Sequence, residues 1–542
     1  MNSILTCKST KNDKTYIALL GAVIGFAVFL VIYGFAPLNP TNENFVLTGY
    51  LEKDIAQHYA GWKLFRNSDW QFPLGVGQNI EYPYGSSVSY TDSIPLFAIF
   101  FKLISPVLPQ TFQYFGLFVC LCFILQGLFG ALLVNLFTDC KVYCGLGAFL
   151  LVLSPVMIER AFRHCALTAH FIIIAALYYY FKNKKNCFKS YIPFYIINII
   201  AITIHPYFLP FSFAIMFAFA VEDFFIGNNR IKSVIHIIAS IIITLAVGYA
   251  IGAFYNEGGK AILGYGYFSM NLNAFFNPIS KGFEGANNWS AVLNDRPYFG
   301  GQTEGFAYLG IGIILAIIIS AVLLIVKNFK EIFEFIKNHF GIIFSTVCLT
   351  IFAIGNGVYY GGLLLFRYPL SDEFIAKYLN IFRGNGRFGW LLFYLLILLA
   401  LYGISKYINS KKIAALILCI VCFVQIFDLS GVLLEKHNYF YNYSSENRQS
   451  GHLFAQHPFW EETVQKVDGV IEMQSEQGSM FGNGLIDIAS MCGEYDKYIN
   501  STFAARTSVA KRNEVIEQQK VKIANGNIDN VLYIVEETKI LN

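Results

Sequence analysis

The sequence predicts an all-α polytopic membrane protein of about eleven transmembrane helices, followed by a small soluble α/β domain at the carboxy terminus. Of the 542 residues, 56% are hydrophobic and only 14% are charged, whereas a soluble protein carries roughly a quarter charged residues. The apolar residues fall in blocks of roughly 17 to 25, the length that crosses about 30 Å of hydrocarbon. Since backbone polar groups cannot stay unpaired in lipid, we expect these blocks to be helices.

The predicted spans occupy the first 430 residues. They lie near residues 16–36, 112–137, 143–157, 166–181, 190–205, 207–226, 234–254, 305–326, 339–355, 388–405 and 412–430. A further apolar run, Ile94–Leu108, is short and bracketed by prolines. We expect it to form an interfacial or re-entrant helix rather than a span.

The placement of basic residues predicts the orientation. Short basic pieces lie at 1–15, 138–142, 182–189, 227–233, 327–338 and 406–411, whereas the loops between them on the other side are long. Because lysine and arginine concentrate in cytoplasmic loops, we expect a multi-pass protein of the plasma membrane with its amino terminus in the cytoplasm. The frequent isoleucine, asparagine and lysine fit a bacterial source with an AT-rich genome. Counting Ile94–Leu108 as a full span would place the basic clusters outside.

The chain changes character after residue 430. Glutamates become frequent, polar helical stretches appear, and the run Asn530–Val535 is typical of a buried strand. The sequence therefore predicts two parts. Residues 1–430 form a transmembrane domain with a large first external loop at 37–111, and residues 431–542 form a soluble extracytoplasmic domain.

A candidate proton acceptor lies in the first external loop. If the segment Thr48–Trp70 is a helix, Asp54, Gln57 and His58 share one face, while Tyr59 and Trp62 belong to an apolar remainder that suits the membrane surface. A carboxylate there can take the proton that a sugar hydroxyl loses as it attacks an anomeric carbon. The simpler interpretation is that Asp54 only solvates or caps a surface helix.

A second carboxylate, Asp92, precedes the predicted re-entrant helix. It can orient an acceptor, bind a divalent cation or cap that helix. The sequence alone does not choose among these three roles.

Basic side chains recur at the predicted external ends of later spans. They are Arg160, His164, His205, Arg383 and Arg387. A single arginine commonly faces lipid headgroups, but five basic groups on one side favour a shared anion such as the phosphate of a lipid carrier. Glu304, which precedes Tyr308 at the start of a span, faces the same side and is expected to pair with one of these cations.

These features together resemble the GT-C superfamily of membrane glycosyltransferases. The shared features are one amino-terminal span, a large external loop with a carboxylate on a surface helix, an interfacial helix and an external carboxy-terminal domain. More closely, four motifs resemble a bacterial family of multi-span membrane proteins thought to be GT-C-like. They read Asp54-x-x-Gln-His-Tyr-x-Gly-Trp62, Phe72-Pro-Leu-Gly75, Asp92-Ser-Ile-Pro95 and Arg383-x-x-Gly-Arg-x-x-Trp390.

The resemblance implies a polyprenyl-phosphate-linked sugar donor and an acceptor at the outer face, which is a surface polysaccharide, lipid or protein. Asp54 then matches the base, with His58 and Asp92 assisting, and the five basic residues hold the donor phosphate. Gln57, Glu304 and Tyr308 support this site. The enzyme would be a glycosyltransferase that inverts the anomeric centre.

The sequence departs from the paired acidic motifs of several superfamily members, because only Glu52 accompanies Asp54. We therefore expect no metal ligand set and no cofactor, with a divalent cation left open. Membrane lipid is an expected partner and nucleic acid is not. Two alternatives stay open: a transporter or flippase for a lipid-linked or anionic solute, and a non-catalytic envelope assembly protein.

Overall fold

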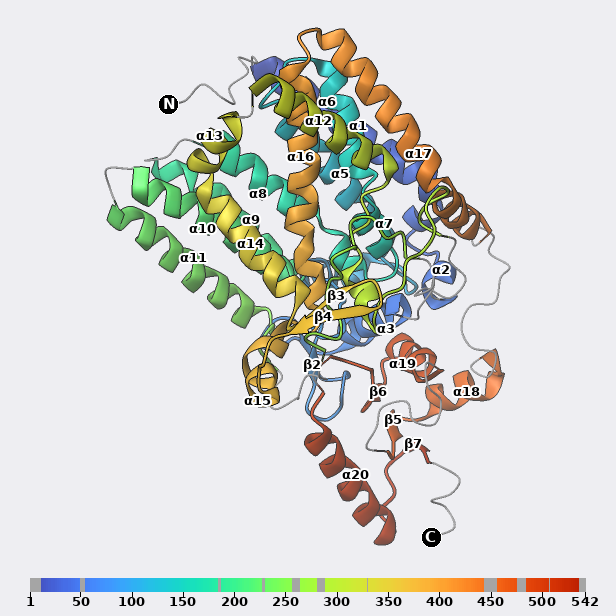
Figure 1. The fold of residues 1–542 in the computed structure, drawn as a ribbon. Coiled ribbons are helices and arrows are strands. Elements are labelled where there is room, and N and C mark those ends of the chain that lie inside the picture. The colour runs from blue at the N-terminus through green and yellow to red at the C-terminus, as the bar shows by residue number, and fades with distance from the viewer. Residues whose placement is uncertain are drawn as a thin grey trace.

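The computed structural model describes residues 11–48, 54–183, 187–226, 230–255, 264–279, 288–328, 330–442, 456–474, 484–505 and 507–535. Most described helices run side by side in one bundle (Figure 1). The helices α2 (Asn44–Thr48) and α3 (Asp54–Asn67) and the carboxy-terminal segment 456–535 gather at one end of this bundle. We call that end the loop face, and it is the side that the sequence predicts to be external.

Seven helices in the described ranges are long and apolar enough to cross a membrane. They contain α1 (Lys11–Tyr33), α5 (Phe115–Val134), α8 (Phe171–Lys182), α10 (Phe208–Ile226), α11 (Arg230–Ala250), α16 (Trp390–Tyr407) and α17 (Lys411–Asn442). Four shorter apolar helices are α6 (Lys141–Val152), α9 (Ile192–Ile204), α12 (Ile311–Asn328) and α14 (Phe340–Ile354). All lie at predicted spans, so the membrane class follows; the count of eleven spans and the orientation stay predictions.

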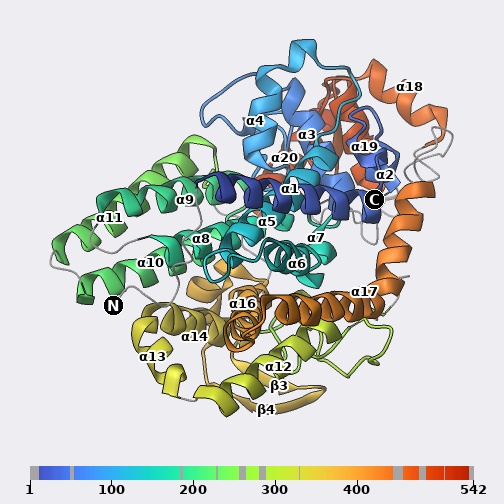
Figure 2. The ribbon, with the colours of Figure 1, turned by 90° about the horizontal axis from the view of Figure 1, so that it is seen from above.

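Small residues let α1 and α5 pack closely, and the two helices lie together in both ribbon views (Figure 1, Figure 2). A Cβ added at Gly21 would lie 2.2 Å from the carbonyl oxygen of Gly127, and one at Gly25 would lie 2.1 Å from that of Phe123. In lipid, where apolar contact gives little net gain, this close backbone approach supplies much of the attraction between helices.

The helix is interrupted inside the bundle after α6, where the sequence predicts one continuous span over 143–157. Helix α6 ends at Val152, and a separate six-residue helix, α7 (Pro155–Arg160), begins at a proline. Because Pro155 lacks an N–H, it cannot continue the ladder of α6 but suits the first position of a new helix. All residues of α7 are buried, so this break carries Arg160 into the protein interior.

Helix α3 contradicts one expectation. Its apolar face does not rest at the membrane surface, because Ile55, Tyr59, Trp62 and Phe65 are fully buried. The indole N–H of Trp62 donates to the carbonyl of Phe112 at 3.0 Å. The aromatic residues therefore fix α3 to its neighbours within the protein.

The predicted re-entrant run begins as the short helix α4 (Pro95–Leu103) and ends in a turn at Ser105–Val107. The loop before it carries β1 (Val76–Gly77) and β2 (Ser86–Ser87), which pair antiparallel. With nine residues, α4 is too short to span a bilayer.

Several short elements complete the loops between the spans. They are α13 (Lys330–Asn338), the antiparallel pair β3 (Gly357–Tyr360) and β4 (Leu363–Arg367), α15 (Asp372–Phe374), and 3-10 turns at Cys165–Thr168, Gln302–Gly305 and Asn385–Gly389.

The carboxy-terminal segment combines helices with a small parallel sheet. Its elements are α18 (Pro458–Lys466), β5 (Gly469–Glu472), α19 (Gly484–Glu494), β6 (Tyr498–Ile499), α20 (Val509–Ala524) and β7 (Val531–Ile534), with strand order β6-β5-β7. Strand β7 lies within the predicted run Asn530–Val535. Helix α17 continues to Asn442, beyond the end predicted at residue 430.

This segment is fastened to the first loop. Ile80 bridges to Ile499, which extends the edge of the sheet, and α19 packs against α3. Lys63 on α3 forms ion pairs with Glu43 at 3.1 Å and with Glu494 of α19 at 2.7 Å. The loop and the carboxy-terminal segment thus form one surface.

Candidate active site

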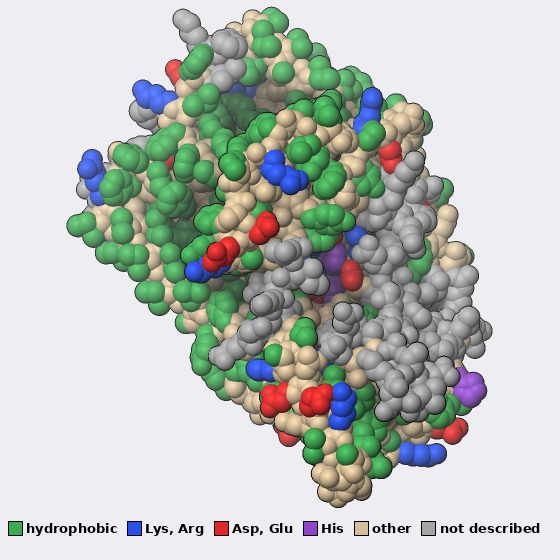
Figure 3. Space-filling view, turned by 60° about the horizontal axis from the view of Figure 1, so that its bottom comes forward, with side chains coloured by type: hydrophobic (Ala, Val, Ile, Leu, Met, Phe, Trp, Pro, Cys, Tyr) green, Lys and Arg blue, Asp and Glu red, His purple; other side chains and the backbone are tan. Residues whose placement is uncertain are grey.

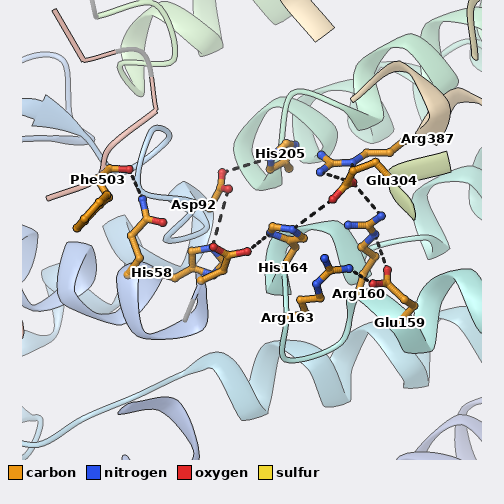
Figure 4. Close-up of polar contacts among 12 residues, drawn as sticks. His58, Asp92, Glu159, Arg160, Arg163, His164, His205, Glu304, Arg387 and Phe503 are labelled. Carbon is orange, nitrogen blue, oxygen red and sulfur yellow. Dashed lines mark hydrogen bonds and ion pairs between the residues drawn. The ribbon is translucent and has the colours of Figure 1, made fainter. Parts of the chain in front are cut away.

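An unbroken line of polar contacts crosses the loop face from α3 to the start of α16 (Figure 4). Oδ2 of Asp54 lies 3.3 Å from Nδ1 of His164, and Nε2 of the same imidazole lies 3.9 Å from Oε1 of Glu304. A histidine from the turn after α7 therefore stands between two carboxylates that are far apart in the sequence.

Arginines form one end of this line. Oε2 of Glu304 lies 3.0 Å from Nη2 of Arg160 and 2.8 Å from Nη2 of Arg387. Glu159 pairs with Nε of Arg160 at 2.7 Å and, through its other oxygen, with Arg163. Three arginines thus face two glutamates, and one positive charge remains in excess.

Arg160 is 1% exposed, and its Nη1 has no hydrogen-bond partner among the described residues. A buried N–H without an acceptor loses free energy unless another group, such as a ligand oxygen, approaches it. The excess charge and the open N–H group both favour an anion at this point.

Asp92 forms a second group with His205 and His58 beside this line, and ligand atoms of His58, Asp92 and His164 lie within 4.8 Å of one another. Oδ1 of Asp92 lies 3.3 Å from Nε2 of His205, and its Oδ2 lies 3.9 Å from Nε2 of His58. Nδ1 of His58 is buried without a hydrogen-bond partner in the described ranges. The side chains of Asp54 and Asp92 keep 32% and 35% of their surface exposed, so a substrate can reach both carboxylates.

The electrostatics keep Asp92 and Glu304 charged and the imidazoles of His58 and His164 neutral. Burial lowers the pKa of His58 to about 4 and that of His164 well below its usual value. Burial alone would raise the pKa of Asp92, but the contact with His205 outweighs burial and lowers that pKa below its ordinary range. For Glu304, the guanidinium groups of Arg160 and Arg387 likewise outweigh burial and lower the pKa.

Unusual backbone conformations hold these side chains in place. Asp92, Ile94 and Phe162 have φ angles of 52°, 53° and 62°. Residues that are not glycine rarely adopt this left-handed region, which costs them on the order of 1 kcal/mol each. Such strain concentrates at functional sites, and here it flanks the carboxylate of the first loop and the hairpin of Arg160.

The site opens to the surface of the loop face. In the space-filling view, histidine and acidic side chains are visible at the bottom of a hollow (Figure 3). The carboxylates are therefore reached from the side on which the long loops lie.

The structure brings together most, but not all, of the sequence-predicted residues. Arg383 is exposed and forms no ion pair with a described residue. Tyr308 donates to Asp428 at 2.7 Å and lies outside the line of contacts. Gln57 donates to the carbonyl of Phe503 and so binds the carboxy-terminal segment to α3. Glu52 lies outside the described residues.

Two partners were not among the predicted site residues. Glu159 holds Arg160 and Arg163, and Tyr207 lies under Arg387, whose guanidinium carbon is 4.7 Å from the ring centroid. Tyr207 also accepts a hydrogen bond from the N–H of Gly384 at 2.8 Å. Its place beside His205 in the His-Pro-Tyr run is the sequence signal that could have indicated it.

One group of side chains offers the geometry of a metal site. Ligand atoms of His58, Asp92 and His164 all lie within 4.8 Å of one another. Imidazole and carboxylate ligands together suit divalent transition metals. If a cation binds in the described part of this site, these three residues are the ones that would hold it.

Comparison with known proteins gives one family and a distant structural similarity. The model of a family described as "Domain of unknown function (DUF6311)" matches residues 22–430. No curated protein matches the sequence. Among solved structures, the crystal structure of the Archaeoglobus fulgidus oligosaccharyltransferase in the apo form is similar, with a TM-score of 0.41 and 14% identity over 90% of this chain. The match covers 64% of that oligosaccharyltransferase chain.

Proposed function

The chain belongs to the DUF6311 family, and we propose that it is a membrane glycosyltransferase of GT-C type. In this proposal it transfers a sugar from a polyprenyl-phosphate-linked donor to a surface polysaccharide, lipid or protein. The reaction takes place on the outer side of a bacterial plasma membrane, with the amino terminus in the cytoplasm. The proposal rests mainly on the contact line that joins Asp54, through His164 and Glu304, to Arg160 and Arg387.

This arrangement combines a base for the acceptor hydroxyl with positive charge for the leaving phosphate, and sugar transfer requires both. An acceptor hydroxyl forms a new bond from its oxygen to the anomeric carbon, while the bond from that carbon to the donor phosphate oxygen breaks. The proton of the hydroxyl passes to Asp54, and the electron pair leaves with the phosphate. Attack from the face opposite the leaving phosphate inverts the anomeric centre.

The neutral imidazole of His164 keeps Asp54 ready to act as a base. In the proposal, Nδ1 of His164, which lies 3.3 Å from Oδ2 of Asp54, carries the proton of the imidazole and fixes the direction of the carboxylate, while burial keeps the imidazole uncharged. Asp92, paired with His205, and the neutral His58 lie on the same side and position the acceptor hydroxyl. Gln57 supports the site by fixing α3 to the carboxy-terminal segment, and Tyr308 by fixing the start of α12 to Asp428.

The leaving phosphate meets the positive end of the site. Nη1 of Arg160 supplies an N–H donor that has no partner among the described residues, and Arg387 contacts Glu304, the carboxylate that also pairs with Arg160. Pre-arranged guanidinium groups stabilise charge that develops as the phosphate departs. In the proposal, the exposed Arg383 adds positive charge at the rim, His205 holds Asp92 through Nε2, and no metal or other cofactor takes part.

The test is the conservative substitution Asp54→Asn in the full-length chain. We expect it to abolish transfer, measured both as surface glycan in cells and as product from lipid-linked sugar in reconstituted vesicles. Asp69→Asn is the matched control, because Asp69 is an exposed carboxylate in the same loop. Unchanged transfer by a normally expressed Asp54→Asn protein would remove the proposed base.

A further inference from the structure

A second cleft on the loop face takes no part in the proposed transfer step. It has a volume of about 390 Å³ and lies where the first loop, the end of α11 and the first turn of α20 meet. α20 projects from this face at the end furthest from the bundle (Figure 1). This volume falls in the range of small-molecule sites, about 300–1,000 Å³.

Aromatic side chains form one wall of the cleft. Tyr82, Tyr84, Tyr249, Phe254 and Tyr255 line it. Tyr249 and Phe254 are 60% and 50% exposed, although large aromatic rings are usually buried. The hydroxyl of Tyr255 donates to the carbonyl of Tyr84 at 3.0 Å, which fixes two of these residues. Flat, fixed aromatic faces beside polar groups suit the C–H faces and hydroxyl edges of sugar rings.

The opposite wall contains a buried arginine with unused donors. Arg512 is 4% exposed, and its Nη2 donates to the carbonyl of Asn500 at 2.7 Å. Nε and Nη1 have no hydrogen-bond partner among the described residues. Glu472 lies 3.7 Å from Nη2, the nitrogen that also donates to Asn500. Nε–H and Nη1–H point in different directions, so each can donate to a separate oxygen of an anionic sugar, and hydrogen bonds from a guanidinium to an anion are among the strong ones.

The start of α20 strengthens the preference for an anion. Ser508 caps this sixteen-residue helix, its first turn holds no acidic residue, and Lys511 and Arg512 follow. Helix N-termini carry partial positive charge and usually attract Asp or Glu, so two cations here are unfavourable without a negative partner. Of the described charged residues that line the cleft, Lys511 and Arg512 are cations and Glu81 is an acid, and the buried Glu472 also pairs with Arg512. The exposed Lys511 is therefore the cation of the cleft that forms no ion pair with a described residue.

A short chain segment connects the cleft to the proposed active site. Asn500 lines the cleft, and three residues later the carbonyl of Phe503 accepts a hydrogen bond from Gln57, one turn after Asp54. The N–H of Ala505 donates to the carbonyl of Tyr90 at 2.7 Å, two residues before Asp92. An extended glycan with one end in the cleft can therefore follow this segment towards both carboxylates.

We infer that this cleft binds a carboxylate-bearing sugar unit of the acceptor, and that the acceptor is an acidic glycan. The inference rests on the proposed function in one respect, namely that the bound glycan is the acceptor of the transferred sugar. The binding site itself rests on Arg512, Lys511 and the aromatic wall. Substrate selection then depends on the carboxy-terminal segment, while transfer takes place at Asp54.

Binding to the full-length chain in lipid nanodiscs tests the inference. The probes are a tetrasaccharide of α-1,4-linked galacturonic acid and its carboxyl-reduced counterpart. We expect the wild type to bind the acidic tetrasaccharide at least tenfold more tightly than the neutral one. Arg512→Gln should weaken the acidic probe at least tenfold and Lys511→Gln about fivefold, whereas Lys520→Gln, which removes the same charge further along α20, should leave binding unchanged.

Two further variants keep the test decisive if Arg512→Gln fails to fold. Tyr249→Ala changes an exposed ring and should weaken both probes, and Lys511→Gln changes an exposed side chain. Equal binding of the two probes by the wild type, or wild-type affinity in Lys511→Gln, would overturn the inference. The variant Asp54→Asn separates the two proposals, because it should still bind the acidic probe but no longer transfer sugar. If it binds the probe and transfers sugar at the wild-type rate, only the proposed function is contradicted.

Discussion

Oδ2 of Asp54, the first residue of α3, lies 3.3 Å from Nδ1 of His164 in the hairpin after α7. The first loop supplies the acid, and the turn before α8 supplies the imidazole that orients it. The contact exists because the aromatic face of α3 is buried in the protein and not in lipid. The proposed base is therefore fixed by packing, which gives each neighbouring residue a measurable role.

His164 is a positioning residue, and His164→Phe should lower kcat by roughly 10- to 100-fold with little change in KM for the donor. The phenyl ring keeps the shape but cannot donate to Asp54. His437→Phe, which changes an imidazole outside the site, is the control. A rise in KM with kcat unchanged would assign His164 to donor binding instead.

His58 should make the stability of the protein depend on pH. Burial lowers its pKa in the folded chain to about 4, whereas an unfolded histidine titrates near 6.5. Above pH 6.5 both states are neutral and the full stability is present; as the pH falls from 6.5 to 4, only the unfolded state gains the proton. At pH 5 this linkage costs on the order of 2 kcal/mol.

The measurement is the thermal unfolding midpoint of the nanodisc-embedded protein between pH 7.5 and 5. We expect the midpoint to fall with pH, and to fall less steeply in His58→Gln, because the variant no longer carries the titrating group. An identical slope in the two proteins would show that His58 does not contribute.

The polytopic fold is the part that the sequence predicts well, since long apolar runs and loop charges depend only on local composition. The strand at β7 follows from the same kind of pattern. The break before α7 was missed, because Ser154-Pro155 lies within an unbroken apolar run and only its packing shows that the chain turns there.

The sequence predicts the types of residue in the candidate site, but it does not predict which side chain pairs with which. The sequence placed Arg160, Arg387 and Glu304 on one side, yet the pairing of both arginines with one carboxylate depends on three separate hairpins. Arg383 and Arg387 carry the same motif signal, and only the turn at Asn385–Gly389 separates the mostly buried side chain of Arg387 from the exposed one of Arg383. The apolar face of α3 was assigned to lipid because composition does not distinguish a lipid neighbour from a protein neighbour.

Glu304 and Arg387 should be strongly coupled. Removing either partner leaves a charge in a mostly buried site, so Glu304→Gln and Arg387→Gln should each destabilise the protein by roughly 3 kcal/mol. The double variant should lose less than the sum, with a coupling of at least about 1 kcal/mol. The exposed pair Glu517 and Lys520 is the control, for which we expect about 0.5 kcal/mol or less. Equal coupling in the two cycles would contradict the buried network.

The two arginines of the motif Arg383–Trp390 should differ in their effect on the KM for the donor. Arg387→Lys keeps the charge but loses the planar fork that pairs with Glu304, and it should raise KM for the lipid-linked donor about tenfold. Arg383→Lys, at an exposed position, should change KM less than about threefold. The reverse order would place the donor phosphate at the rim rather than inside the site.

Transfer should survive chelation of divalent cations, because the proposal gives the leaving charge to Arg160 and Arg387. We expect at least half of the activity of reconstituted protein to remain in excess EDTA. Loss of activity that Mn²⁺ restores would contradict this prediction. In that case Asp92→Asn should prevent the restoration, since Asp92 belongs to the group that can hold an ion.

The contact between α1 and α5 gives a prediction about the scaffold that is independent of the chemistry. A Cβ at Gly127 would lie 2.1 Å from the carbonyl oxygen of Gly21, a backbone atom that can move only if the helices separate. A Cβ at Gly130, one turn further along α5, would lie 3.1 Å from a methyl group of Leu151, which can rotate away. We therefore expect Gly127→Ala to destabilise the protein by roughly 1 to 3 kcal/mol and to lower its thermal midpoint in detergent, whereas Gly130→Ala changes it little. Both variants add the same methyl group to the same helix. Equal thermal midpoints for the two variants would therefore contradict the close backbone contact between α1 and α5 at Gly127.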